Sequence, residues 1–230
     1  MNPKDKIHSS WLPFLTDVLE KDESLKELNS KVLPNSTYFP KTEDIFNVFE
    51  MPLKDIKVVI LGQDPYPTEG NAIGYAFAVN EEINKPASLR IIEKEVGHDI
   101  DKTLKTWRDQ GVFLLNTALT VQAGKAGSHL QYWKNFTTSI ISHISKNNPC
   151  IWILWGKKAQ EYRAFINKPS VLIVNGRNIP QLQDGFNYVL TAPHPAAEAY
   201  SGGTAGFLGC NHFNQVNEIL KNTKKELIKF

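Results

Sequence analysis

Five short runs of apolar, largely β-branched residues divide this chain into alternating stretches. The runs cover residues 56–61, 112–116, 150–155, 170–174 and 188–192. Near-continuous apolar runs of this length are typical of strands that are buried on both faces of a sheet. Helix-compatible segments, such as those that begin at Ser88, Trp133 and Lys157, lie between the runs. Strands that alternate with helices predict a mostly parallel sheet between helical layers, which is a three-layer α/β/α fold.

Polar, turn-forming residues follow four of these runs. The first run leads into GQDPYP (62–67), the second ends on Asn116-Thr117, the third leads into Gly156-Lys157, and the last leads into APHP (192–195). Open α/β sheets bind their ligands outside the carboxyl ends of the strands. We therefore expect these four segments, which are distant in sequence, to share one crevice.

Each of these segments also has a simpler explanation. Asp64 and Pro65 can form a plain turn, because aspartate favours turn starts and proline fixes φ. Asn116 can simply end a strand, and His194 with Pro195 can mark a loop. The coincidence of all of them at one edge of one sheet favours a functional site over unrelated turns.

Composition and charge narrow the class of protein. With 230 residues, of which 41% are hydrophobic and 10% aromatic, the chain can bury one core, and we expect a single domain over residues 1–230. The formal net charge is only +2, so any site for a polyanion would have to be local. Cys150 and Cys210 form no C-x-x-C pair, which argues against a disulfide scaffold and a zinc site. We expect no metal and no cofactor.

The sequence contains no pattern for membrane insertion or secretion. It has no stretch of about 18 apolar residues, and the amino-terminal MNPKDKIHSSW lacks a charged-then-apolar signal pattern. We therefore expect no membrane partner and a cytoplasmic location, or a nuclear one if the host is eukaryotic.

Ordered motifs along nearly the whole chain resemble one family. They are YFPKTEDIFNVFEMPLKDIKVVILGQDPY, GYAFAV, PASL, WRDQGVFLLNTALTV, SHLQYWKNFT, ILWGKKAQ, HP and GFLGCNHFNQVNEIL. On these motifs the chain resembles the uracil-DNA glycosylases, in the group that carries the GQDPY water-activating motif (family 1). The resemblance implies a central four-stranded parallel sheet, so the fifth apolar run, residues 188–192, would be peripheral to that sheet or would not be a strand.

The resemblance also implies a reaction, which is hydrolysis of the N-glycosidic bond between uracil and deoxyribose. This step of DNA repair leaves an abasic site, and the implied partner is uracil-containing DNA, single- or double-stranded. The reacting carbon is hidden inside a duplex, so the nucleotide must be rotated out of the stack at a cost of about a few kcal/mol. The transition state is expected to resemble an oxocarbenium ion, with negative charge accumulating on the leaving base.

By resemblance, two residues carry this chemistry. Asp64 positions and activates the water, and as an anion it stabilises the sugar cation. His194 donates a hydrogen bond to uracil O2 as a neutral imidazole, which stabilises the charge on the leaving base.

Four further residues match the uracil pocket of the family. The Asn116 amide would accept from uracil N3–H and donate to O4, whereas cytosine presents the opposite pattern at both atoms. Phe77, in GYAFAV, would stack on the base; outside this motif context it would be interpreted as a core aromatic in a strand. Tyr66 would fill the space beside C5 and exclude the methyl group of thymine, and Gln63 would offer backbone contacts.

Short loops match the phosphate contacts of the family, which fits the modest net charge. Ser88, in PASL, would use its hydroxyl and backbone N–H at a helix start, or it could be only the N-cap of that helix. Pro67 stands where many members carry a histidine, which we interpret as a change in phosphate contact or loop stiffness. Gly156 begins another loop, in which Lys157 replaces the usual serine; the lysine would lie near a phosphate or be solvated.

The largest departure from the family follows His194. The family usually has HPSPLS, in which a serine touches phosphate and a leucine wedges into the duplex, whereas this chain has Ala196 and Glu198 at those positions. The loop is also longer and contains a flexible Gly-Gly pair. A carboxylate is a poor wedge, because it repels phosphate and is desolvated within the stack, so we expect Glu198 to weaken duplex binding. We hypothesise that Tyr200 is the wedge; the alternative is that Tyr200 packs under the loop.

Other functions stay open at this point. A non-catalytic DNA-binding accessory protein could keep the fold, but it could lose Asp64, Asn116 and His194 without penalty, and all three are present. A nucleotide-binding metabolic enzyme would need a glycine-rich phosphate loop, which GQDPYPTEG is not. The altered loop could also extend the substrates to other deaminated bases, whereas Tyr66 and Asn116 favour uracil. DNA-mimicking inhibitor proteins are further candidate partners, and a monomer is expected.

Overall fold

Helices and strands alternate along the chain in the computed structural model, which describes residues 6–167, 169–174 and 185–230. The helices are α1 (Leu12–Lys21), α2 (Glu23–Glu27), α3 (Ala87–Val96), α4 (Lys105–Arg108), α5 (Leu130–Asn147), α6 (Lys157–Gln160), α7 (Pro195–Ser201) and α8 (His212–Asn222). The strands are β1 (Tyr38–Phe39), β2 (Val58–Gly62), β3 (Val112–Asn116), β4 (Val121–Gln122), β5 (Ile151–Trp155), β6 (Pro169–Val174) and β7 (Asn187–Ala192). Short helical turns occur at Leu28–Val32, Leu33–Asn35, Thr42–Asp44, Asn47–Glu50, Leu53–Asp55 and Glu161–Phe165.

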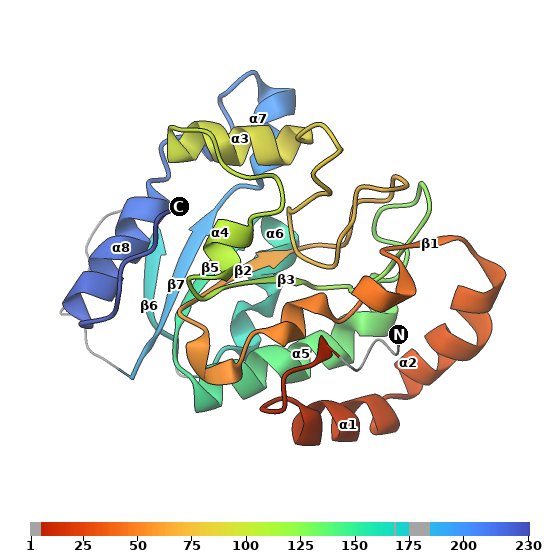
Figure 1. The fold of residues 1–230 in the computed structure, drawn as a ribbon. Coiled ribbons are helices and arrows are strands. Elements are labelled where there is room, and N and C mark those ends of the chain that lie inside the picture. Colours follow the sequence, from red (N-terminus) through yellow and green to blue (C-terminus); the bar gives the residue numbers. More distant parts are fainter. Residues whose placement is uncertain (1–5, 168, 175–184) are drawn as a thin grey trace.

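Five of the strands form one parallel sheet in the order β3-β2-β5-β7-β6 (Figure 1). All five apolar runs of the sequence are therefore strands, as expected. The four-stranded sheet that the family resemblance implies is present as β3-β2-β5-β7. The run at 188–192, expected to be peripheral or not a strand, is β7, which pairs with β5 and β6 inside the sheet, so that expectation is wrong; β6 is the edge strand beyond it.

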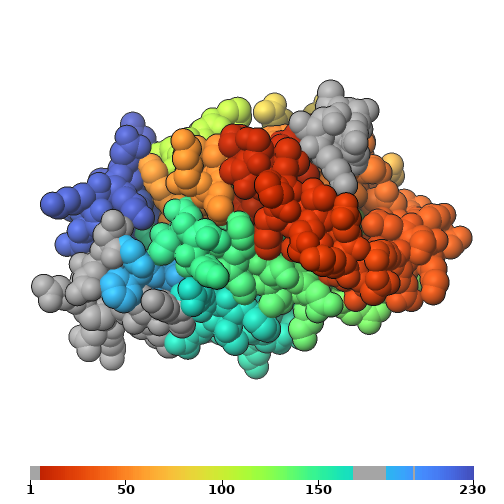
Figure 2. Space-filling model, turned by 90° about the horizontal axis from the view of Figure 1, so that it is seen from below, coloured from red at the N-terminus to blue at the C-terminus, as the bar shows by residue number. Residues whose placement is uncertain are grey.

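Two helical layers enclose this sheet, because successive side chains of a strand point to opposite faces. Val58 and Ile60 of β2 pack in the layer of α3, α4 and α8, and Val59 and Leu61 pack in the layer of α1, α2 and α5. Burial of each such aliphatic side chain contributes about 1.5–3 kcal/mol. Figure 2 shows the amino-terminal residues (red) beside α5 (green) on the outer surface of the second layer. The three-layer α/β/α fold is thus confirmed.

A second, two-stranded sheet lies near the carboxyl ends of the main strands. β1 and β4 pair antiparallel, with Tyr38 opposite Gln122 and Phe39 opposite Val121. The Ala123 N–H then donates to the Thr37 carbonyl oxygen at 2.9 Å. This pairing fixes the start of the segment that runs from β4 to α5.

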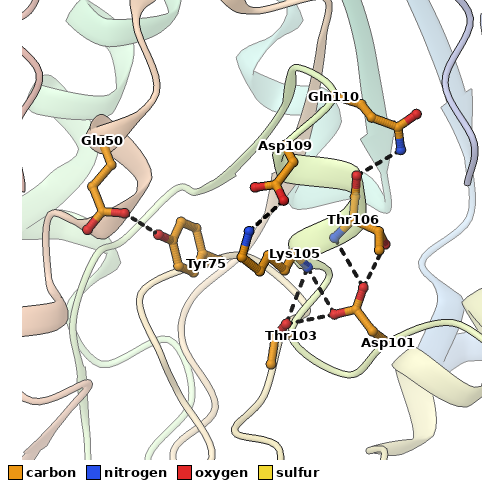
Figure 3. A network of polar contacts seen from close by, with 8 residues as sticks. All are labelled: Glu50, Tyr75, Asp101, Thr103, Lys105, Thr106, Asp109 and Gln110. Carbon is orange, nitrogen blue, oxygen red and sulfur yellow. Dashed lines mark hydrogen bonds and ion pairs between the residues drawn. The ribbon is translucent and has the colours of Figure 1, made fainter.

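A cap of hydrogen bonds holds the short helix α4 in place (Figure 3). Asp101 accepts from the Thr103 hydroxyl at 2.6 Å, from the Lys105 N–H at 2.9 Å, and from the Thr106 N–H and hydroxyl at 3.2 and 2.6 Å. Burial alone would raise the pKa of Asp101, but the hydrogen bonds from Thr103, Thr106 and Lys105 lower it to about 2. The ionised carboxylate therefore stabilises the first turn of α4.

Candidate active site

A cleft of about 410 Å³ opens at the carboxyl ends of β2 and β3. Among the residues that line it are ten of the thirteen expected at the site: Gln63, Asp64, Tyr66, Pro67, Phe77, Ser88, Asn116, His194, Ala196 and Tyr200. Three of the four segments expected to share a crevice therefore meet there. Gly156 and Lys157, which form the fourth segment, do not line the cleft, and neither does Glu198.

Asp64 follows β2, and two donors hold its carboxylate. The Gly127 N–H donates to Oδ2, and Gln63 Nε2 donates to Oδ1 at 3.0 Å. Burial raises the pKa of Asp64, the hydrogen bonds from Gly127 and Gln63 lower it, and the net direction is above the ordinary value. A fixed carboxylate with a raised pKa in a cleft is suited to act as a general base toward water.

His194 is the N-cap of α7, and this position decides which ring nitrogen carries the proton. The Ala196 N–H donates to His194 Nδ1 at 3.1 Å, so the neutral ring carries its hydrogen on Nε2. Burial lowers the pKa of His194, which favours that neutral form. The imidazole therefore offers an uncharged N–H donor to a group bound in the cleft.

Gly156 packs against the His194 side chain, outside the cleft. Its φ is +87°, and a Cβ at this position would lie 2.9 Å from His194 Cβ. Both the backbone conformation and the space therefore require glycine. Lys157 is exposed at the start of α6. Gly156 thus has a packing role behind His194, and neither it nor the exposed Lys157 shares the cleft as expected; that either residue contacts DNA stays a prediction.

Asn116 ends β3 directly opposite Gly62 of β2. A Cβ on residue 62 would lie 2.3 Å from Asn116 Oδ1, so only glycine leaves room for the amide. Thr117 ties the two strand ends together, because its N–H and hydroxyl donate to the carbonyl oxygens of residues 62 and 63 at 2.9 and 2.6 Å. The Asn116 side chain is 6% exposed and is thus held in a narrow range of orientations.

Phe77 lies in a turn with φ of +65°, a conformation that an aromatic residue rarely adopts. Phe77 is buried among the core residues, as the interpretation as a core aromatic has it, but it does not lie in a strand. Its ring contacts Trp155 edge-on, with 5.5 Å between centroids, and lies 5.9 Å from the His194 ring. The unusual backbone conformation places the phenyl ring on the wall of the cleft.

Tyr66 forms the wall beside Phe77, and two hydrogen bonds fix its hydroxyl. The hydroxyl donates to the Phe77 carbonyl oxygen at 3.2 Å and lies 3.1 Å from Ser88 Oγ. Burial raises the pKa of Tyr66 to about 12, against a smaller lowering by Ser88, so the phenol stays neutral. Ser88 is the second residue of α3, whose N-cap is Pro86, so the explanation of Ser88 as the N-cap is wrong.

The segment after His194 is the helix α7 and not the flexible loop that its small residues suggest. Pro195 occupies the first helical position, and Gly202 ends the helix in the left-handed conformation with φ of +65°. Ala196 and Tyr200, which are four residues apart on one helix face, both line the cleft. Tyr200 is 89% exposed, so the alternative that it packs under the loop is wrong.

Glu198 differs most from its expected position, because its side chain is only 2% exposed. The carboxylate accepts from the N–H groups of Ala205 at 3.2 Å and Leu208 at 3.0 Å, and from that of Phe207. Burial alone would raise the pKa of Glu198, but these backbone hydrogen bonds lower it below the ordinary value. The expectation that this carboxylate faces DNA and repels phosphate is therefore wrong, since it is paired within the protein.

Two contributors to the cleft were missed from the sequence. Gly127 acts through its backbone N–H, which leaves no mark in a pattern of side chains. Tyr75 lines the cleft, and the centroid of its ring lies 3.8 Å from the Arg108 guanidinium carbon. Its hydroxyl donates to the Glu50 carboxylate at 3.1 Å (Figure 3). Its place in GYAFAV, two residues before Phe77, is the signal that could have identified it.

In the described parts of the chain, no three His, Cys, Asp or Glu side chains gather closely enough to hold a metal ion. Among the described helices, none is both long and apolar enough to cross a membrane. The side chains that line the cleft include hydrogen-bonding groups, such as those of Asp64, Asn116 and His194, and aromatic rings, such as those of Tyr66 and Phe77.

The family model of the uracil DNA glycosylase superfamily matches residues 49–221. The chain belongs to this superfamily. The uracil-DNA glycosylase of Fusobacterium nucleatum is 37% identical over 228 residues, covering 94% of this chain and 92% of the relative. That of Aliivibrio fischeri is 42% identical over 218 residues, covering 90% and 86%.

Solved structures of this superfamily share the fold. The crystal structure of mimivirus uracil-DNA glycosylase superimposes with a TM-score of 0.82 at 25% identity, covering 99% of this chain and 88% of that chain. A Y322L variant of the mimivirus protein, solved in complex with UGI, matches with the same TM-score and identity. The superfamily and the fold inferred from the sequence motifs are thus confirmed.

Proposed function

We propose that this chain is a DNA repair enzyme that flips uracil out of DNA and hydrolyses its N-glycosidic bond, leaving an abasic site. The observation that carries the proposal is the meeting of Asp64, Asn116 and His194 in one cleft, each held in a defined orientation. Relatives named uracil-DNA glycosylase, 37–42% identical over most of the chain, support it. We also assign the chain to the GQDPY group (family 1), on the motif at 62–66.

The Asp64 carboxylate acts on the sugar side of the scissile bond. It accepts a proton from the attacking water and, while ionised, stabilises the positive charge that develops on the deoxyribose. The donors Gly127 and Gln63 hold the carboxylate in place before substrate binds, so little reorganisation is needed during reaction. General base catalysis of this kind contributes about 10²–10⁴-fold.

His194 acts on the uracil side of the bond. Its Nε2–H donates to uracil O2, where negative charge accumulates as the bond breaks, and the Ala196 N–H on Nδ1 prevents the opposite tautomer. Because burial lowers the pKa of His194, the ring is neutral before and during the step. A positioned donor of this kind is worth about 10²–10³-fold in rate.

Base selection rests on the Asn116 amide and the Tyr66 ring. The amide, confined next to Gly62, accepts from uracil N3–H and donates to O4; cytosine would leave both amide groups unpaired. The Tyr66 ring, fixed by two hydrogen bonds, fills the space that the C5 methyl group of thymine would need. Phe77 offers its ring face for stacking on the flipped base.

Contacts with the rest of the DNA come from the mouth of the cleft. The backbone N–H of Ser88 lies in the first turn of α3, where helices favour an anion such as a phosphate. Tyr200, exposed on α7, enters the duplex as the wedge that occupies the space left by the flipped nucleotide. Pro67 and Ala196 line the path of the strand without offering a charge.

The same cleft is a site for inhibitor proteins that mimic DNA. A mimivirus relative with the same fold has been solved in complex with UGI, which supports this part of the proposal. We further propose that the protein acts as a cytoplasmic monomer. Gel filtration with light scattering on the purified chain would reveal a dimer, which would contradict the monomer proposal.

The decisive experiment is alkaline strand cleavage of oligonucleotides after incubation with the purified protein. Duplexes with U:G, U:A, T:G or hypoxanthine and a single strand with uracil distinguish the possible substrates. We expect cleavage at uracil in both strand states and none at thymine or hypoxanthine. DNA binding without release of any base would instead identify a non-catalytic accessory protein.

A further inference from the structure

Two carboxylates hold the turn that follows α7. Glu198 of α7 accepts from three backbone N–H groups between residues 205 and 208. Glu95 of α3 accepts from the N–H groups of Gly209 at 2.6 Å and Asn211 at 2.8 Å. Successive N–H groups that converge on one point form an anion-binding nest, and here protein carboxylates occupy it. The turn is thereby linked to α3 by one carboxylate and to α7 by the other.

The position of Glu198 fixes the rotation of α7 about its axis. Successive residues of a helix are about 100° apart, so Glu198 and Tyr200 lie on nearly opposite faces. Because the carboxylate is buried in the turn 205–208, Tyr200 must face outward, and it is 89% exposed at the cleft. Ala196, one turn before Tyr200, shares its face and also lines the cleft.

The helix itself has little means of holding this orientation. α7 is only seven residues long, and Gly202 and Gly203 follow it. Helices of this length are marginal in water without tertiary contacts. α7 is fixed at its start by His194 and packs along α3 (Figure 1). The hydrogen bonds of the Glu198 carboxylate join the second half of α7 to the turn 205–208, beside local contacts between Ser201 and Thr204.

We propose that Glu198 is a positioning residue for duplex substrates: by binding the turn 205–208 it fixes the rotation of α7 and holds Tyr200 where a wedge must enter the DNA. The inference rests on the proposed role of Tyr200 as that wedge. It reverses the effect expected from the sequence, since replacing Glu198 by leucine, which the family usually has here, removes the anchor and supplies no wedge.

The test is a double-mutant cycle on the full chain with Glu198→Leu, Tyr200→Ala and the combined variant. Single-turnover excision is measured on a U:A duplex and on the same uracil strand alone. We expect Glu198→Leu to lower the ratio of duplex to single-strand rate by about tenfold, the size of one lost buried interaction. The combined variant should show the same ratio as Tyr200→Ala alone, because an unpositioned and an absent wedge are equivalent.

Two controls separate positioning from general loss of structure. Glu218→Leu removes an exposed carboxylate from α8 and should change neither rate. Glu198→Gln keeps one carbonyl oxygen as acceptor, so its ratio should lie between those of the parent and Glu198→Leu. If Glu198→Leu does not fold, as judged by its thermal unfolding transition, the comparison of Glu198→Gln with Tyr200→Ala carries the test.

A second readout follows the flipped state directly. With 2-aminopurine beside the uracil in the duplex, unstacking raises the fluorescence, and Glu198→Leu should reduce that rise as Tyr200→Ala does.

Three outcomes would contradict the proposal. If both Glu198 variants retain the parent ratio of duplex to single-strand rate while Tyr200→Ala lowers that ratio, Tyr200 is the wedge but Glu198 does not position it. If Tyr200→Ala itself lowers both rates equally, the wedge is wrong and this inference fails with it. Effects of the two substitutions that add in the combined variant would also contradict the proposal.

Discussion

The floor of the cleft and its rim are built in different ways. The floor, formed by Gly62, Asp64 and Asn116, lies at the ends of the neighbouring strands β2 and β3 and is held by backbone contacts and close packing. The rim, formed by α7, is a short helix whose buried carboxylate Glu198 accepts hydrogen bonds from backbone N–H groups of the turn that follows. In the proposed function, the floor and His194, which stands at the N-cap of α7, carry the chemistry of base release, and Tyr200 on the exposed face of α7 opens the duplex.

This difference predicts two distinct classes of variant. A change in the floor should affect every substrate, because the flipped uracil occupies it whether the DNA was paired or not. A change in the rim should affect duplex DNA most, since a single strand has no stack to open. The ratio of duplex to single-strand rate is therefore the quantity that tests the comparison.

The largest effect is expected from Asp64→Asn in the floor. The amide can neither accept the proton of water nor balance the sugar cation, so excision should fall by about 10²–10⁴-fold. The fall should be equal for both substrates, with the affinity for uracil-containing DNA largely kept. Single-turnover rates and fluorescence anisotropy measure the two quantities, and a rate within tenfold of the parent would refute the role given to Asp64.

Gly62→Ala tests whether close packing in the floor orients the Asn116 amide. The added methyl group would lie 2.3 Å from Asn116 Oδ1 and 2.8 Å from Ala76 Cβ, which is too close for both. We therefore expect the excision rate to fall by about a hundredfold on both substrates. In an Asn116→Ala background the same substitution should lower the excision rate much less, because the amide that it displaces is already absent. Additive losses in the pair would show that residue 62 acts independently of Asn116.

The pH dependence of kcat/KM distinguishes the two catalytic groups. The Asp64 pKa is raised, so the active carboxylate should be lost at a higher pH than for an ordinary aspartate near about 3.9, with about a tenfold fall per pH unit below that point. His194 has a lowered pKa and must be neutral, so no break is expected near pH 6.5. A break there that disappears in His194→Gln would contradict the neutral-donor mechanism.

Tyr200→Ala is the corresponding test of the rim. Removal of the exposed ring should lower duplex excision by about tenfold, because an open stack costs a few kcal/mol and the wedge offsets part of it. Single-strand excision should fall far less. The matched comparison is Tyr200→Phe, which keeps the ring and should keep the duplex rate; equal losses in both variants would point to the hydroxyl instead.

The floor could be predicted from the sequence to a large extent, and the rim could not. Apolar runs place Asp64 and Asn116 at strand ends, and parallel strands bring those ends to one edge of the sheet. Glu198 was misplaced because its partners are backbone N–H groups of a later turn, which no side-chain pattern reveals. Gly127 was missed for the same reason, and the helix α7 was taken for a loop because its residues are small.

The smallest effect is expected from Asp101→Asn, which lies in neither region and tests stability alone. The substitution weakens the cap on α4, and loss of a helix cap costs about 0.5–2 kcal/mol. Because the pKa of Asp101 is lowered to about 2 in the folded state, its contribution is present above about pH 4, the ordinary range of aspartate, and is lost as the pH falls toward 2. Urea unfolding should therefore show a gap between variant and parent at pH 7 that closes toward pH 2. Both excision rates should match those of the parent. A change in the ratio of duplex to single-strand rate would show that α4 also takes part in opening the duplex.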